Sequence, residues 1–127
     1  MEGLAIHFDN EEIDDVVIMR IHDERVDSRI SSHYKQEFLA LRNEGICKVI
    51  VDLSEVNFVD SSGLGALLFG RRIFSEDGGD LRIVGAFEKV LSMFKIAKLD
   101  RVFEFFENRE TALESFREDE EEEGLET

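Results

Sequence analysis

The segment Val59-Asp60-Ser61-Ser62-Gly63-Leu64-Gly65-Ala66-Leu67-Leu68 links a short apolar run to an apolar helical pattern. The run before it, residues 48–53, is rich in β-branched side chains, which is typical of a central strand buried on both faces. The two serines and the glycine predict the start of a helix, where small polar residues can satisfy unpaired N–H groups. A strand that leads into a helix through a polar turn indicates an α/β fold.

The same alternation continues toward the C-terminus. Residues 77–80 predict a turn after the helix, and residues 81–84 predict a second buried strand. The next helix has apolar residues at positions i, i+3, i+4 and i+7, which are Phe87, Val90, Leu91 and Phe94. Residues 102–106 predict a last strand, and Asn108 predicts the cap of a short final helix.

Toward the N-terminus the pattern begins with strands. Apolar residues at 4–8 and 16–21 predict a hairpin, joined by a polar, acidic turn at 9–15. A helix follows, capped by Ser31 or Ser32 and ended by Gly45. Its apolar face is formed by Tyr34, Phe38 and Leu41.

This order of elements predicts an α/β fold with a mixed, largely parallel β-sheet and about four packed helices in a single domain. In such sheets, functional groups gather at the carboxyl ends of the strands, where loops lead into helices. Residues 60–63 follow a central strand and are predicted to lie in that zone.

Length and composition fit one domain, because 127 residues with 43% apolar content suffice for one core. We expect the domain to span residues 1–116. Residues 117–127 include the run Glu118–Glu123 and predict an acidic, disordered tail. The tail is interpreted as a solubilising extension, with binding to a basic partner surface as the alternative.

The formal net charge of −15 argues against direct binding to nucleic acid or to anionic membranes. The sequence has no apolar run long enough to cross a membrane and no signal peptide at its start. A single cysteine, Cys47, excludes an intramolecular disulfide and fits a reducing compartment. We therefore expect a cytoplasmic protein.

The sequence predicts no catalytic, cofactor or metal site. The histidines and the cysteine of this chain do not have the spacing of metal ligands; they are His7, His22, His33 and Cys47. Ser61 follows an aspartate and does not lie in a G-x-S-x-G elbow. Gly63 and Gly65 suggest a nucleotide loop, but a dinucleotide fingerprint would need a glycine in place of Leu68. A small enzyme or nucleotide-binding domain is therefore the last of the alternatives.

Residues 51–53 and 58–65 together resemble the signature of the STAS domain in bacterial anti-sigma factor antagonists, whose core is D-S-S-G-L-G. The resemblance covers most of the chain up to the final short helix. It implies a STAS-type fold and a protein that binds an anti-sigma factor which is also a serine kinase. In that family, phosphorylation of the first serine of the motif ends the interaction, and a serine phosphatase restores it.

Carried over by position, the resemblance implies that Ser61 is the phosphorylated residue, although the local sequence alone leaves Ser62 open. It also implies that an aspartate before the first helix, Asp27, contributes to partner binding; a purely structural role in the turn is the alternative. The family often has a glycine where this chain has Glu24. The predicted partner-binding set is Asp27, Asp60, Ser61, Ser62, Gly63, Leu64 and Arg72.

Two less specific interpretations remain. Ser61 and Ser62 could be simple helix caps, in which case the chain would be a STAS scaffold or an accessory subunit of a signalling or transporter complex. Arg72 could be a solvated arginine near the end of its helix instead of a docking residue.

Overall fold

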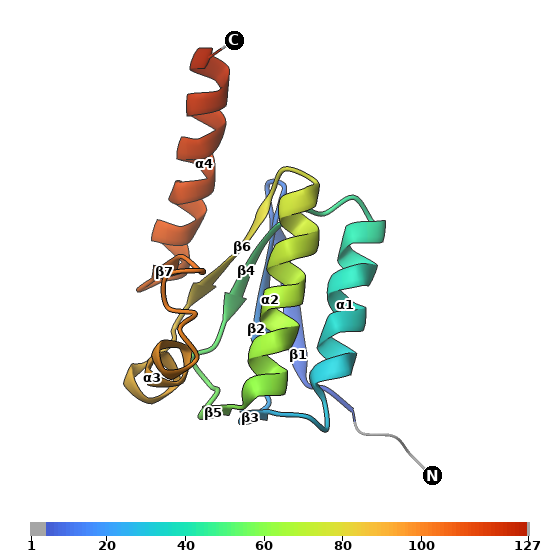
Figure 1. Ribbon diagram of the computed structural model, residues 1–127. Coiled ribbons are helices and arrows are strands. Elements are labelled where there is room, and N and C mark those ends of the chain that lie inside the picture. The colour runs from blue at the N-terminus through green and yellow to red at the C-terminus, as the bar shows by residue number, and fades with distance from the viewer. Residues whose placement is uncertain (1–4, 127) are drawn as a thin grey trace.

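A five-stranded sheet organises the computed structural model, which describes residues 5–126 (Figure 1). Its strands, in spatial order, are β1 (Phe8–Ile13), β2 (Val16–Ile21), β4 (Lys48–Asp52), β6 (Asp80–Val84) and β7 (Phe105–Phe106). β1 pairs with β2 in antiparallel fashion, and every other pair is parallel. The predicted mixed, largely parallel sheet is therefore confirmed, although the last strand is shorter than the predicted 102–106.

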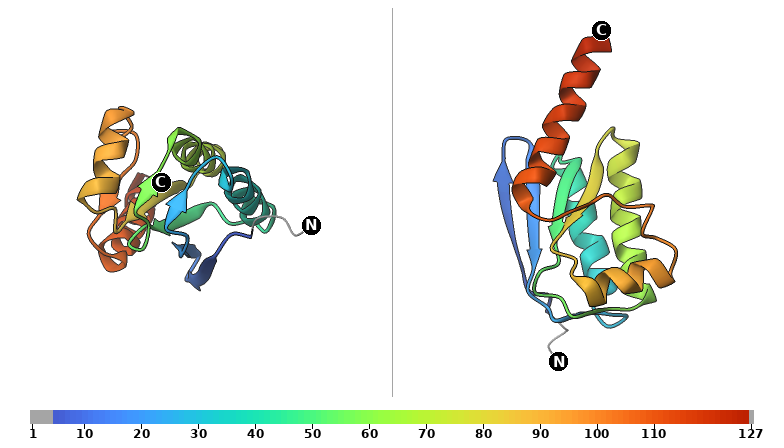
Figure 2. Two further views of the ribbon diagram at one scale, coloured as in Figure 1. Left: turned by 90° about the horizontal axis from the view of Figure 1, so that it is seen from below. Right: turned by 90° about the vertical axis from the view of Figure 1, so that its left-hand side faces the viewer.

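Four helices pack around this sheet: α1 (Ser31–Asn43), α2 (Ser61–Glu76), α3 (Glu88–Ile96) and α4 (Arg109–Glu126). α1 and α2 lie side by side on one face, and the first half of α4 covers the other (Figure 2). The α1–α2 pair meets through Phe38 and Phe74, whose ring centroids are 5.9 Å apart. Gly70 allows this approach, because a Cβ there would lie 2.7 Å from the Phe38 ring. The prediction of a single α/β domain with four helices is confirmed.

A small second sheet ties two loops together below the main one. β3 (Arg25–Val26) pairs in parallel with β5 (Phe58–Val59). β3 precedes α1 and β5 precedes α2, so this pairing places the starts of the two helices next to each other. Both strands lie at the carboxyl ends of β2 and β4 (Figure 1).

The first hairpin differs from its prediction. The acidic segment predicted as a turn is the strand β1, and the turn consists of Asp14 and Asp15 alone, with Asp14 at a φ of 58°. β1 is an edge strand with mostly exposed side chains, so its acidic residues stay in water while its backbone pairs with β2. Of the predicted first strand, Leu4 lies outside the described residues.

The start of α1 also differs from its prediction. Its N-cap is Ile30, which makes no side-chain cap, and Ser31 is a buried first residue of the helix. The carbonyl oxygen of Asp27 accepts hydrogen bonds from the N–H groups of Ile30 and Ser31, at 3.1 and 2.9 Å. Asp27 therefore shapes this turn, and the prediction that Ser31 or Ser32 caps the helix is wrong. Gly45 ends the helix as predicted, with a φ of 89°.

α4 continues to Glu126, so a helix spans most of residues 117–127, the segment predicted as a disordered tail. Arg82 on β6 is only 5% exposed, and its guanidinium lies over the Phe116 ring at 4.1 Å and pairs with Asp119. Lys48 pairs with Glu120, the residue after Asp119. These two cations of the sheet thus bind acidic residues near the start of the acidic run. Composition alone could not show that Arg82 and Lys48 lie beneath this part of α4.

Candidate partner-binding site

Asp60 is the residue that organises the start of α2. It is the N-cap, and its Oδ1 accepts a hydrogen bond of 2.9 Å from the N–H of Gly63. Its Oδ2 accepts a second hydrogen bond, 3.1 Å long, from the N–H of Ser28 in the loop before α1. One carboxylate thus caps α2 and holds a loop that lies 32 residues earlier in the chain. The alternative that the two serines are the caps is wrong, because Asp60 occupies that position.

Ser61 and Ser62 are the first two residues of α2. The side chain of Ser61 is exposed and that of Ser62 is half-buried. Within residues 5–126, neither hydroxyl has a hydrogen-bond partner. Ser61 therefore presents an unengaged hydroxyl beside the unpaired N–H groups of a helix N-terminus, where an added anion is favoured.

Gly63 and Leu64 support this surface from beneath. A Cβ at Gly63 would lie 2.2 Å from the carbonyl oxygen of Val26, so only glycine fits against β3. Leu64 is 5% exposed and belongs to the main core. Both residues of the predicted set hold Ser61 in position, and neither offers a side chain to a partner in this structure.

Asp27 lies on the neighbouring loop and is engaged by two arginines. Its carboxylate accepts a hydrogen bond of 3.1 Å from Nε of Arg29, and the side chain of Arg25 lies 3.7 Å away. The Arg29 hydrogen bond holds the pKa of Asp27 below its usual value. Since Val26 pairs with Val59 and Ser28 binds Asp60, the segment around Asp27 runs alongside the one that leads into Ser61.

A stripe of residues that are exposed, or in the case of Gly65 half-buried, extends along α2 from Ser61. Gly65, Leu68 and Arg72 follow it at i+4, i+7 and i+11, which places them on one face of the helix. Leu68 is 38% exposed, so it does not belong to the buried face of α2. The guanidinium of Arg72 lies 5.6 Å from the centroid of Phe69. We call Ser61, Gly65, Leu68 and Arg72 the α2 stripe.

Two members of the stripe, Gly65 and Leu68, are missing from the predicted partner-binding set. A Cβ at Gly65 would meet nothing within 4 Å, in contrast to the crowded Gly63. A glycine inside a helix costs about 0.5 to 1 kcal/mol relative to alanine. Packing within this chain therefore does not explain why position 65 is a glycine. Its position on the helix face between Ser61 and Leu68 is the sequence signal that could have placed it on this surface.

The loop before β5 is fastened to the first hairpin by a histidine. His22 lies between two carboxylates, with Nε2 at 2.7 Å from Asp9 and Nδ1 at 3.0 Å from Glu55. These contacts, led by the one with Asp9, raise the pKa of His22. Glu55 belongs to the segment that leads through β5 into Ser61, so the charge of His22 affects how firmly that segment is held.

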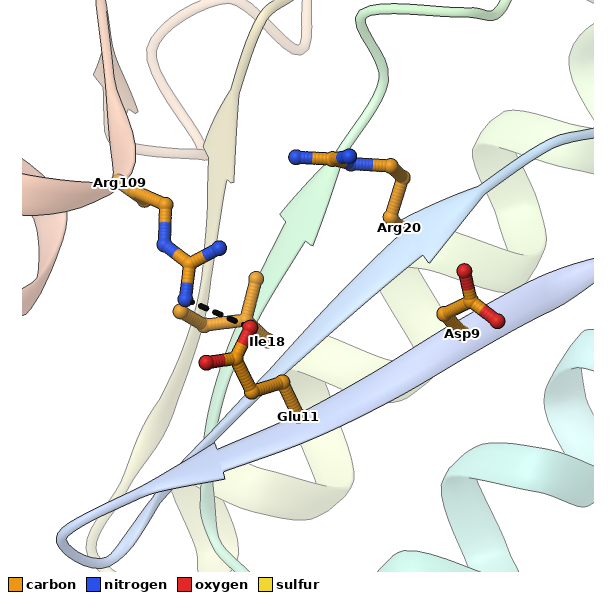
Figure 3. Close-up of a pocket in the computed structure, with 5 residues that line it drawn as sticks. All are labelled: Asp9, Glu11, Ile18, Arg20 and Arg109. Atoms are coloured by element: carbon orange, nitrogen blue, oxygen red, sulfur yellow. Dashed lines mark ion pairs between the residues drawn. The ribbon is translucent and has the colours of Figure 1, made fainter.

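Pockets and side-chain clusters give little support to a catalytic or nucleotide site. A hollow of about 100 Å³ lies on the sheet face between β1 and α4, lined by Asp9, Glu11, Ile18, Arg20 and Arg109 (Figure 3). Arg109 points to Glu11, 2.9 Å away, and Arg20 pairs with Asp52 at 3.2 Å. The hollow is smaller than typical ligand pockets, and both of its cations are already paired. Within residues 5–126, no group of three or more His, Cys, Asp or Glu is arranged to hold a metal, and no helix has both the length and the apolar character to cross a membrane.

Known proteins resemble this chain in both sequence and fold. The family model for the STAS domain matches residues 7–112. A candidate anti-sigma factor antagonist of Thermotoga maritima is 30% identical over 105 residues, covering 83% of this chain and 93% of the relative. The crystal structure of a candidate anti-sigma factor antagonist from Thermotoga maritima has a TM-score of 0.78 at 28% identity, covering 87% of this chain and 94% of that one.

More distant structures share the fold at lower identity. The anti-sigma factor antagonist SpoIIAA in its unphosphorylated form has a TM-score of 0.74 at 19% identity, covering 87% of this chain and 96% of that one. The phosphorylated form of SpoIIAA, a Bacillus cell fate determinant, has a TM-score of 0.66 at 18% identity, covering 87% and 99%. The family-model match over residues 7–112 shows that the chain belongs to the STAS domain family, and the relatives named above are anti-sigma factor antagonists or candidates for that role.

Proposed function

We propose that this protein is a cytoplasmic, non-enzymatic anti-sigma factor antagonist that works by partner switching in the regulation of transcription. It binds a kinase-type anti-sigma factor through the α2 stripe, which frees a sigma factor. The kinase then phosphorylates Ser61, which ends the interaction, and a serine phosphatase restores the binding form. The observation that carries this proposal is the unengaged, exposed hydroxyl of Ser61 at the head of an exposed helix face.

The chain itself tolerates a phosphate on Ser61. The modification adds about −1.5 to −2 charges, and the N-terminus of α2 stabilises a nearby anion by roughly 0.3 to 1 kcal/mol. The carboxylate of Asp60 repels it, but that carboxylate is occupied by the N–H groups of Gly63 and Ser28. The two effects oppose each other at the surface, so phosphorylation leaves the fold intact.

A bound partner does not tolerate it. A surface packed against the α2 stripe would have to bury or pair a new dianion, at a cost on the order of several kcal/mol. Since about 1.4 kcal/mol is a tenfold change in affinity, this cost is enough to release the partner. Gly65 supports the same surface, because a helix position without a side chain lets a partner backbone approach closely.

The test combines intact-mass analysis with binding. The protein is incubated with a cognate kinase-type anti-sigma factor and ATP, and one added phosphate is expected on wild type and on Ser62→Ala but not on Ser61→Ala. In pull-downs, Ser61→Ala binds the partner and Ser61→Asp does not, while circular dichroism shows both folded. Wild-type binding by Ser61→Asp would contradict the switch. A chain that binds its partner but is never phosphorylated would instead be the STAS scaffold or accessory subunit.

A further inference from the structure

The unpaired cations of this acidic chain are concentrated in one place. The whole sequence contains fifteen Lys and Arg residues and thirty Asp and Glu residues. In the described part of the chain, eleven of these fifteen cations pair with a carboxylate or lie over an aromatic ring. The exceptions, which have neither kind of contact within residues 5–126, are Lys89, Lys95, Lys98 and Arg101. All of them lie on α3 or in the turns that follow it.

Among the side chains that the structure describes, the two most exposed large apolar ones lie on α3 or at its N-cap. Phe87 is 63% exposed and Ile96 is 82% exposed. Phe87 is also the N-cap of α3, where it makes no side-chain cap and where Ser, Thr, Asp or Asn would stabilise the helix. A contribution to helix capping therefore does not explain why a phenylalanine occupies position 87.

Phe87 borders an apolar groove. This groove has a volume of about 480 Å³ and runs between the start of α3 and β7. Its lining is formed by Gly85, Ala86, Phe87, Leu91, Phe105, Phe106 and Glu107. A groove of this size and character can receive an apolar side chain. Two of the unpaired lysines, Lys89 and Lys95, lie on the helix that borders the groove.

α3 lies at the same end of the molecule as the start of α2, whose first residue is Ser61 (Figures 1 and 2). The N–H of Val59 on β5 approaches the sulfur of Met93 on α3 at 3.4 Å. Ser61 follows Val59 by two residues, so the groove and the α2 stripe share one end of the fold.

From these observations we infer that α3 is a second docking surface, which takes an acidic segment of a protein partner with an apolar anchor side chain. The anchor fills the groove beside Phe87, and the acidic residues around it pair with Lys89 and Lys95. Charge complementarity selects this occupant, because residues 87–102 carry four cations and two carboxylates, a net charge of +2 in a chain whose net charge is −15. A flat anionic bilayer would fit less well, because it could not fill a groove. The inference does not depend on phosphorylation of Ser61.

The test uses a short fluorescein-labelled peptide in which one phenylalanine is flanked by aspartate and glutamate residues. Fluorescence anisotropy is expected to show binding that weakens as sodium chloride rises from about 50 to 500 mM. The double variant Lys89→Glu/Lys95→Glu should bind at least about tenfold more weakly. The matched control Arg42→Glu/Arg117→Glu changes the net charge equally but away from α3, and it should bind as wild type does.

Phe87→Ser separates docking from folding. Serine is a better N-cap than phenylalanine, so this variant should melt at the same or a higher temperature and yet lose binding at least about tenfold. A control peptide with alanine in place of its phenylalanine should also bind weakly. Equal binding by wild type, Phe87→Ser and the lysine variant would overturn the inference. Sedimentation with phosphatidylglycerol vesicles, or self-association abolished by Phe87→Ser, would also overturn it, in favour of a membrane or of a second copy.

Discussion

The carboxylate of Asp60 accepts a hydrogen bond of 3.1 Å from the N–H of Ser28, while its other oxygen caps α2 at Gly63. The loop that carries Asp27 and the helix that begins with Ser61 therefore depend on the same side chain. A substitution at Asp60 is expected to disturb both elements together.

Asp60→Ala should lower the free energy of unfolding by about 1 to 2 kcal/mol, as measured by urea denaturation, because both N–H groups lose their acceptor. Asp60→Asn should cost less, since the amide oxygen can still cap Gly63 but cannot also serve Ser28 as a charged acceptor. Equal stability of Asp60→Ala and wild type would show that water replaces both hydrogen bonds without cost.

Gly63 and Gly65 provide a matched pair two residues apart. Gly63→Ala should destabilise the protein, because its Cβ would collide with the carbonyl of Val26. Gly65→Ala should stabilise it by about 0.5 to 1 kcal/mol, because the Cβ enters open space in a helix. Under the proposed function, Gly65→Ala should nevertheless weaken anti-sigma factor binding. Stronger or unchanged binding by this more stable variant would remove Gly65 from the interface.

The contacts of His22 predict a pH dependence of stability. Hydrogen bonds to Asp9 and then to Glu55 raise the pKa of His22 above its value of about 6.5 in an unfolded chain. A raised pKa means that the folded state binds the proton more tightly. The contribution is therefore complete below about pH 6.5 and is lost as the pH rises through the folded-state pKa.

Melting curves between about pH 6 and 8 should show this loss in wild type and a smaller change in His22→Gln. His33→Gln is the control, because His33 pairs with no carboxylate within residues 5–126 and its replacement should leave the pH dependence unchanged. Identical pH profiles for wild type and His22→Gln would contradict a role for His22.

The contacts of Arg82 predict that this side chain anchors the acidic half of α4 to the sheet. Arg82→Met removes the guanidinium that binds Asp119 and Ser115 and lies over Phe116. Amide hydrogen exchange in residues 117–126 should accelerate relative to α1 and α2, because the anchored turn loses its cation. Arg117→Met is the control, since Arg117 is exposed and its pairs contribute little. Unchanged exchange in Arg82→Met would show that α4 does not need this anchor.

Local patterns predicted most of the fold because its central elements are strongly periodic. The run at residues 48–53 and the helix after Ser61 were placed correctly, and parallel topology put Ser61 at the carboxyl end of the sheet. Contacts between distant segments could not be predicted in this way. The bond from Ser28 to Asp60 and the approach of Val26 to Gly63 join residues far apart in the sequence, and the two-residue strands that create them have no periodicity. The length of α4 likewise depends on Arg82 and Lys48, which belong to the sheet.

α4 extends past the edge of the sheet, away from the end that holds Ser61 and α3 (Figure 1). This arrangement has a practical value for measurement. A reporter or a surface linkage attached near Glu126 would stand clear of the α2 stripe and of the apolar groove. The chain can thus be immobilised by that end while both faces stay open to solution, so that the affinities of the two surfaces can be measured on one molecule.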